Sequence, residues 1–290
     1  MGAHISTRPL QLKHLVLTFC SGYSFAVYER FVESLFQTVF QCRLVMFISQ
    51  SDIPTVQPLQ KKYADKFEYI ACTWSFHPQT FRYFLYKTYL QNLIPAPDLV
   101  FICDSRDVLF QKNIFDYPLS PDIALWLFAE DMTIGQDAKW NSKWLQQVDA
   151  DSLPLLAQQR ILCSGTTMGR YLAMMIYLNL MTTVVKQRFL SKNRAAELGA
   201  VDQGIHNFIA YRSELLTAEL YKQKLQMAIL TNEDDLIHTI GVVPKHSLDV
   251  NEEGRVILKP NRISCCVHQY DRLNADLLYK LGQRTGFNVV

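Results

Sequence analysis

Two aspartates three residues apart, Asp104 and Asp107, directly follow the apolar run from Leu99 to Cys103. An apolar run of this length between breakers predicts a strand buried on both faces. Ligands of open α/β sheets bind at the carboxyl ends of parallel strands, so both carboxylates are expected at a ligand site. Carboxylate oxygens suit a hard divalent cation that keeps positions open for substrate phosphates. A surface turn that begins with aspartate is the alternative.

A second acidic pair, Glu130 and Asp131, follows the predicted strand over residues 123–128. The polar segment after it carries Trp140 and Trp144, whose rings are suited to stacking on sugars. Trp144 could instead anchor a loop in the core. These residues therefore indicate either a carbohydrate site or ordinary packing.

Three later segments place polar residues beside apolar runs. Ser164 and Gly165 lie among small residues, which let backbone N–H groups approach a ligand closely; the threonines after them could simply cap a helix. Asp202 and Gln203 open a predicted helix, where Asp202 also suits the N-cap. His268 ends an apolar run near the C-terminus, where a lone histidine is usually structural.

The elements that would position these residues follow an α/β rhythm. A strand over 14–19, a small-residue turn, a helix over 25–40 and a strand over 43–49 predict a βαβ unit. Its turn lacks the glycine pattern of dinucleotide-binding folds, and the chain contains no P-loop. An aromatic helix over 80–93 precedes the central strand, and its Arg82 faces either phosphates or solvent. The last third predicts short strands over 225–230, 235–243 and 256–258, and a helix over 273–281.

Bulk composition narrows the classes of protein. The 290 residues are 49% hydrophobic with a net charge of +2, so neither nucleic acid nor an anionic membrane is an expected partner. No apolar run is long enough to span a bilayer. The seven scattered cysteines are typical of a reducing compartment, which favours a cytoplasmic protein. We expect a flexible tail over 1–13 and a single domain over 14–290.

Four sequence motifs, in their order along the chain, carry a resemblance to a known family. An acidic motif ends a central strand, a Ser-Gly-Thr-Thr segment follows, Asp-Gln opens a helix, and a histidine lies near the C-terminus. Over roughly residues 15–272 this order resembles the GT-A glycosyltransferases, the nucleotide-diphospho-sugar transferases that include glycogenin and the lipopolysaccharide galactosyltransferases. Its phrases are similar to those of a largely uncharacterised glycosyltransferase group. The resemblance implies one GT-A (Rossmann-like) α/β domain, with a mostly parallel central sheet flanked by helices and a smaller C-terminal elaboration of short strands.

The resemblance also implies roles for individual residues. Asp104, Asp107 and His268 would bind Mn²⁺ or Mg²⁺, although the family motif is D-x-D and here Arg106 stands where its second aspartate would be. Asp202 and Gln203 would lie beside the reacting sugar. The residues expected to bind the nucleotide-diphospho-sugar are Phe19, Ser21, Gly22, Tyr23, Arg82, Arg106, Ser164 and Gly165. Of these, Ser164 and Gly165 belong to a segment that resembles the family's small-residue loop near the acceptor.

The implied function is a metal-dependent transferase of the hexosyltransferase type, which moves a sugar from the donor to a glycan-type acceptor. An inverting reaction needs a general base, for which Glu130 or Asp131 is the candidate; in a retaining reaction Asp202 would assist. The glycogenin-like order favours retention. The alternatives are a nucleotidyltransferase of related fold and a non-catalytic module that binds nucleotide sugars or glycans.

Overall fold

The computed structural model describes residues 13–241, 247–258 and 261–289. A seven-stranded sheet lies at its centre, in the order β3-β2-β1-β4-β7-β6-β8. Four neighbouring strands are parallel, and β6 and β8 are parallel to each other, whereas β7 runs antiparallel to both β4 and β6. The mostly parallel sheet expected from the sequence is therefore confirmed. Its strands are β1 (His14–Phe19), β2 (Cys42–Ile48), β3 (Phe67–Ala71), β4 (Leu99–Cys103), β6 (Ile123–Thr133), β7 (Arg160–Arg170) and β8 (Gln226–Leu230).

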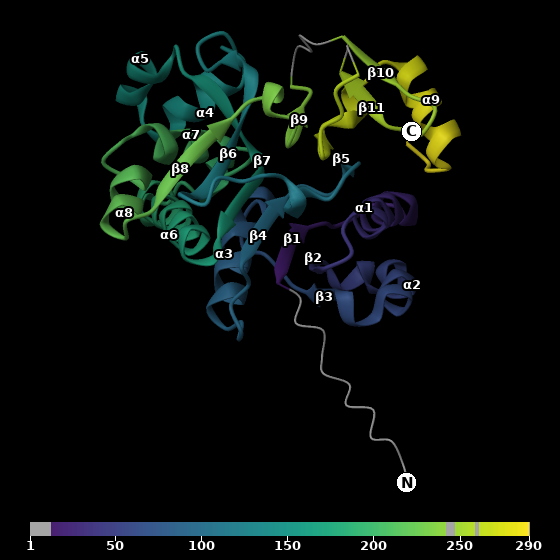
Figure 1. The fold of residues 1–290 in the computed structure, drawn as a ribbon. Coiled ribbons are helices and arrows are strands. Elements are labelled where there is room, and N and C mark those ends of the chain that lie inside the picture. Colours follow the sequence, from purple (N-terminus) through teal and green to yellow (C-terminus); the bar gives the residue numbers. More distant parts are fainter. Residues whose placement is uncertain (1–12, 242–246, 259–260, 290) are drawn as a thin grey trace.

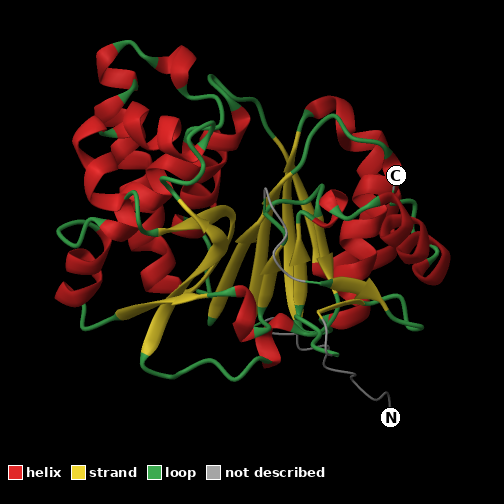
Figure 2. Cartoon of the chain, turned by 90° about the horizontal axis from the view of Figure 1, so that it is seen from above, coloured by secondary structure: helices red, strands yellow, loops and turns green. Residues whose placement is uncertain are grey.

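Helices cover both faces of this sheet (Figures 1 and 2). Successive residues of β1 point to opposite faces: Leu15 and Leu17 belong to one hydrophobic cluster and Val16 to another. The cluster of Val16 includes side chains of α1 (Phe25–Thr38) and α2 (Ile53–Tyr63). The cluster of Leu15 and Leu17 includes side chains of α3 (Pro78–Gln91), α4 (Asn141–Val148), α5 (Leu153–Leu156), α6 (Tyr171–Arg188), α7 (Asp202–Tyr211) and α8 (Leu216–Lys222).

Short strands of the C-terminal region, joined by β5 from earlier in the chain, make up a smaller part, as the sequence predicts, although the short strand expected over 225–230 belongs to the central sheet as β8. β5 (Val108–Phe110), β12 (Cys266–His268) and β9 (Ile237–Thr239) form a three-stranded sheet next to the end of β4. β10 (Leu248–Val250) pairs with β11 (Val256–Leu258), and the final helix α9 (Ala275–Thr285) packs beside them (Figure 1). Within the described residues, no helix has the length and apolarity to cross a membrane.

The structure also corrects several boundaries. The segment that reads as small and hydroxylated, residues 161–169, is a buried strand, β7, so its threonines cap no helix. Helix α4 lies in the polar segment for which no element was predicted. Of the strand expected over 235–243, residues 237–239 form β9, and residues 242–243 lie outside the described residues, as does all but Lys13 of the expected tail. The division into a tail and one domain stays a prediction.

Candidate metal centre and adjoining cavities

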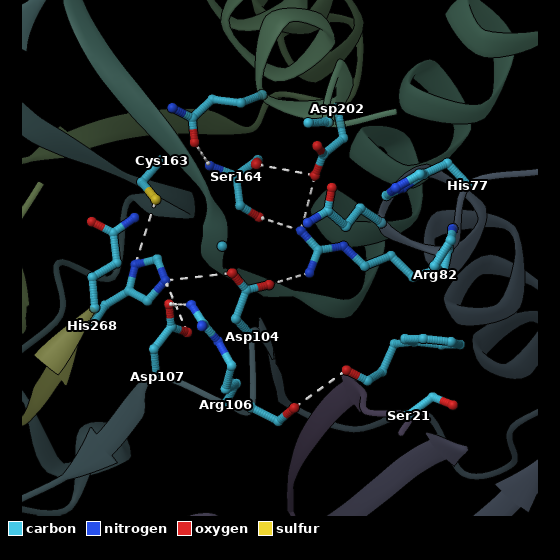
Figure 3. Close-up of a pocket in the computed structure, with 18 of the residues that line it drawn as sticks. Ser21, His77, Arg82, Asp104, Arg106, Asp107, Cys163, Ser164, Asp202 and His268 are labelled. Carbon is cyan, nitrogen blue, oxygen red and sulfur yellow. Dashed lines mark hydrogen bonds and ion pairs between the residues drawn. The ribbon is translucent and has the colours of Figure 1, made fainter. Parts of the chain in front are cut away.

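Asp104, Asp107 and His268 converge although about 160 residues separate them in the chain. β4 delivers Asp104, whose N–H donates to the Gly165 carbonyl at 2.8 Å. His268 ends β12, which pairs with β5 directly after Asp107. One ligand atom from each of the three residues lies within 4.8 Å of the other two. Figure 3 shows the His268 ring facing both carboxylates, with Nε2 at 3.4 Å from Asp104 Oδ2 and 3.8 Å from Asp107 Oδ1.

The state of the His268 ring fits a metal ligand. The side chain is 1% exposed, and its Nε2 meets no hydrogen-bond partner among the described residues. The other ring nitrogen, Nδ1, lies 3.4 Å from the Cys163 sulfur, which fixes the orientation of the ring. The 3.4 Å contact with Asp104 leaves this buried nitrogen without a hydrogen bond, which is costly, and a divalent cation between Nε2 and the two carboxylates would satisfy it.

Electrostatics at the three residues also favour added positive charge. Burial raises the pKa of Asp107, and the neighbouring Asp104 charge raises it further, more than His268 and Arg106 lower it. Burial alone would likewise raise the pKa of Asp104, but Arg82 and His268 together outweigh burial and lower it. Burial lowers the pKa of His268, yet Cys163 and the two carboxylates outweigh burial and raise it. A cation at this position would stabilise the ionised form of Asp107.

Arg82 is buried and links two carboxylates, so the alternative that its side chain faces solvent is wrong. It is 6% exposed and forms ion pairs with Asp104 and Asp202, as Figure 3 shows. Asp202 also accepts from Ser164 Oγ at 3.1 Å. Asp202 is the first residue of α7 and its side chain caps nothing, because Val201 holds the N-cap position. The guanidinium of Arg82 therefore holds both Asp202 and Asp104, one of the candidate metal ligands.

A cavity of about 610 Å³ opens over this candidate metal centre. The first turn forms one end of it and is held by Asp52, which accepts from the Gly22 N–H at 3.1 Å and from Ser21 Oγ at 2.9 Å. Most predicted site residues line it: Phe19, Ser21, Tyr23, Arg82, Asp104, Arg106, Asp107, Ser164, Gly165, Asp202, Gln203 and His268. Sequence reasoning missed Trp74, His77, Cys163 and Gln269 in its lining, as well as the bracing role of Asp52.

A second cavity of about 510 Å³ adjoins the first. Gln203 joins the two: its Oε1 accepts from the Ser164 N–H at 3.3 Å, and its Nε2 lies 3.5 Å from Glu130 Oε1. Of the two proposed bases, only Glu130 lines this cavity. Asp131 lines neither cavity and accepts from Asn232 Nδ2 at 3.0 Å. The lining of the second cavity comprises Glu130, Asp137, Trp140, Asn141, Trp144, Ala200, Gln203, Gln269 and Arg272.

The sheet with its C-terminal short strands defines a GT-A-like α/β fold. No family model matches the chain, and no curated protein matches its sequence. Among solved structures, the chain is similar to an active-site mutant of LgtC, a GT-A glycosyltransferase, with a TM-score of 0.54. The match covers 94% of this chain and 95% of that chain at 9% sequence identity. At this identity the likeness shows the fold alone.

Proposed function

We propose that this protein is a metal-dependent glycosyltransferase that moves a sugar from a nucleotide-diphosphate donor to a hydroxyl group of a glycan-type acceptor. The observation that carries the proposal is the convergence of Asp104, Asp107 and His268 at the carboxyl end of β4. The fold likeness to LgtC supports it, because that protein is a glycosyltransferase.

In this proposal the donor occupies the larger cavity. The first turn receives the nucleoside, while Asp104, Asp107 and His268 hold Mn²⁺ or Mg²⁺. The bound ion would offset the negative charge that develops on the departing diphosphate. Arg106, whose side chain is 51% exposed at the cavity, adds a guanidinium that suits phosphate oxygens.

The acceptor would approach from the side of Glu130 and Gln203. In an inverting reaction Glu130 is the base that removes the hydroxyl proton. In a retaining reaction Asp202, held at 3.0 Å from Arg82 Nη2, lies beside the reacting sugar. The anomeric configuration of the product, read by NMR from its coupling constants, separates the two routes.

The test is a screen of nucleotide sugars with Mn²⁺, in which release of nucleoside diphosphate is measured with and without a chelator. Metal-dependent release supports the proposal, and Asp104→Ala should abolish it. Asp98→Ala is the matched control, since Asp98 is exposed at the opposite end of β4. Release of pyrophosphate from nucleoside triphosphates would instead indicate a nucleotidyltransferase, and nucleotide-sugar binding without turnover would indicate a binding module.

A further inference from the structure

The second cavity combines an aromatic wall with a buried carboxylate. Trp140 and Trp144 stack with ring centroids 5.8 Å apart and an interplanar angle of 29°. Both rings line the cavity, and Trp140 is 46% exposed although it is among the largest apolar side chains. An exposed indole surface in a concave site favours a ligand with a flat apolar face.

The two buried carboxylates of this cavity differ in their free hydrogen-bonding capacity. Asp137 is occupied at the start of α4, where it accepts from the Trp140 and Asn141 N–H groups and from Asn141 Nδ2. Glu130 is 3% exposed, and the hydrogen bond that it accepts from Gln203 is long, at 3.5 Å. An ionised carboxylate offers about four acceptor positions, so Glu130 has capacity left for ligand hydroxyl groups.

Charge disfavours an anionic ligand at this position. A second negative group beside buried Glu130 would be repelled strongly because little water screens the pair. Of the cations of this region, Arg272 lines the cavity with an exposed side chain, and the Lys139 ammonium rests 4.9 Å from the Trp140 ring centroid. The donor cavity differs, because there the buried Arg82 lies beside the metal centre.

We propose that the second cavity is the acceptor site and takes a neutral pyranose ring, which stacks on the tryptophan pair and donates a hydroxyl hydrogen bond to Glu130. The assignment rests on the proposed function for its acceptor role. Trp144, Gln203 and Arg272 line both cavities, so a ring bound here lies next to the donor cavity.

Binding of saccharides can be measured without any donor. We would titrate wild-type protein with neutral methyl pyranosides and follow saturation-transfer NMR, then repeat the titration with methyl glucuronides and sugar phosphates. Trp140→Ala should weaken binding of the neutral pyranoside by about tenfold, the upper range for one aromatic contact, and Trp140→Phe should restore part of it. Tyr279→Ala is the control, because that ring is 67% exposed on α9 and should leave binding unchanged.

Two results would overturn the assignment. One is equal affinity of wild type and Trp140→Ala for the neutral pyranosides, with unchanged thermal unfolding. The other is binding of the glucuronide or sugar phosphate that is tighter than binding of the neutral pyranoside and is lost in Arg272→Ala. This would show that the cavity binds an anionic ligand through Arg272.

A second measurement separates this inference from the proposed function. Wild type is assayed for nucleoside diphosphate release in water and for transfer to the bound pyranoside, and the ratio of transfer to hydrolysis should fall in Trp140→Ala. If wild type binds pyranosides through Trp140 but consumes no donor, the glycosyltransferase proposal and the acceptor role fail while the saccharide site stands. If wild type hydrolyses donor but Trp140→Ala leaves the ratio unchanged, the site fails and the function stands.

Discussion

Replacing Gly165 by alanine tests the candidate metal centre at a position where the backbone approaches Asp104 and His268 closely. A Cβ atom at this position would lie 2.6 Å from Asp104 Oδ2 and 2.7 Å from His268 Nε2. Ordinary van der Waals contact begins at about 3.4 Å, so these two ligand atoms would have to move by about 0.8 and 0.7 Å, and His268 Cε1, at 2.4 Å, by about 1.0 Å. Metal sites tolerate deviations of only about 0.2 Å in their ligand distances. Gly165→Ala should therefore weaken Mn²⁺ binding by about 10- to 100-fold, the range found when groups that orient metal ligands are altered.

The assay is a titration of free Mn²⁺ by electron paramagnetic resonance, with the melting temperature measured on the same samples. Gly169→Ala is the matched control, because it lies in the same strand and its Cβ would meet the side chain of Leu125 rather than the metal centre. Both variants should lose about 1–3 kcal/mol of stability through overpacking. A folded Gly165→Ala protein that binds Mn²⁺ as tightly as Gly169→Ala would refute the reasoning.

Three further changes probe the neighbouring groups. Arg82→Met should cost about 3–5 kcal/mol in the free energy of unfolding, because Asp202 stays buried without its partner; denaturant melts would measure this, and a loss under 1 kcal/mol would contradict it. Glu130→Gln should lower kcat/KM by about 10²–10⁴-fold while donor affinity holds, if the reaction inverts; and since burial raises the pKa of Glu130, wild-type activity should rise with pH through a value above the ordinary 4.3 or so. Asp52→Ala should lower the free energy of unfolding by about 2 kcal/mol at neutral pH, because the first turn loses its hydrogen bonds to this carboxylate. Burial would raise the pKa of Asp52, but its hydrogen bonds from Ser49, Ser21 and Gly22 outweigh burial and lower it. The wild-type advantage in urea melts should therefore begin to fall as the pH drops below about 4, the unfolded-state pKa, and be lost as the pH passes through the lower pKa of the folded state; a constant advantage would argue against this.

In the central sheet, hydropathy predicts the apolar strands and misses β7, which is not apolar throughout. The runs over 14–19 and 99–103 became β1 and β4 because their side chains fill both hydrophobic clusters. β7 is equally buried, yet its residues from Ser164 to Thr167 are small and polar. Such a strand is specified by its neighbours on both sides, β4 and β6, and not by its own apolar residues.

The residues of the candidate site also divide into those that sequence patterns predict and those that they do not. Asp104, Asp202 and His268 were predictable because each lies where an apolar run ends or a helix begins. The connection made by Arg82 was not, since helical periodicity places a cation on a face but says nothing of the two carboxylates that neutralise it. Asp52 follows the second strand at the ligand edge, so its position indicates a site residue in the same way as that of Asp104.

The D-x-x-D spacing brings both carboxylates to the same place because the chain begins a new strand directly after Asp107. Val108 pairs with His268, and the Gln269 N–H donates to the Asp107 carbonyl at 2.7 Å. The pairing of β5 with β12 thus brings the carboxylate of Asp107 to the histidine, and no carboxylate is needed at position 106. Arg106 instead pairs with Asp107 at 3.3 Å and with Asp271 at 3.0 Å at the cavity. Two carboxylates and a deprotonated imidazole would balance a divalent ion, and Asp202 and Asp271 match the charges of Arg82 and Arg106. The guanidinium groups would therefore serve a diphosphate as positioned hydrogen-bond donors.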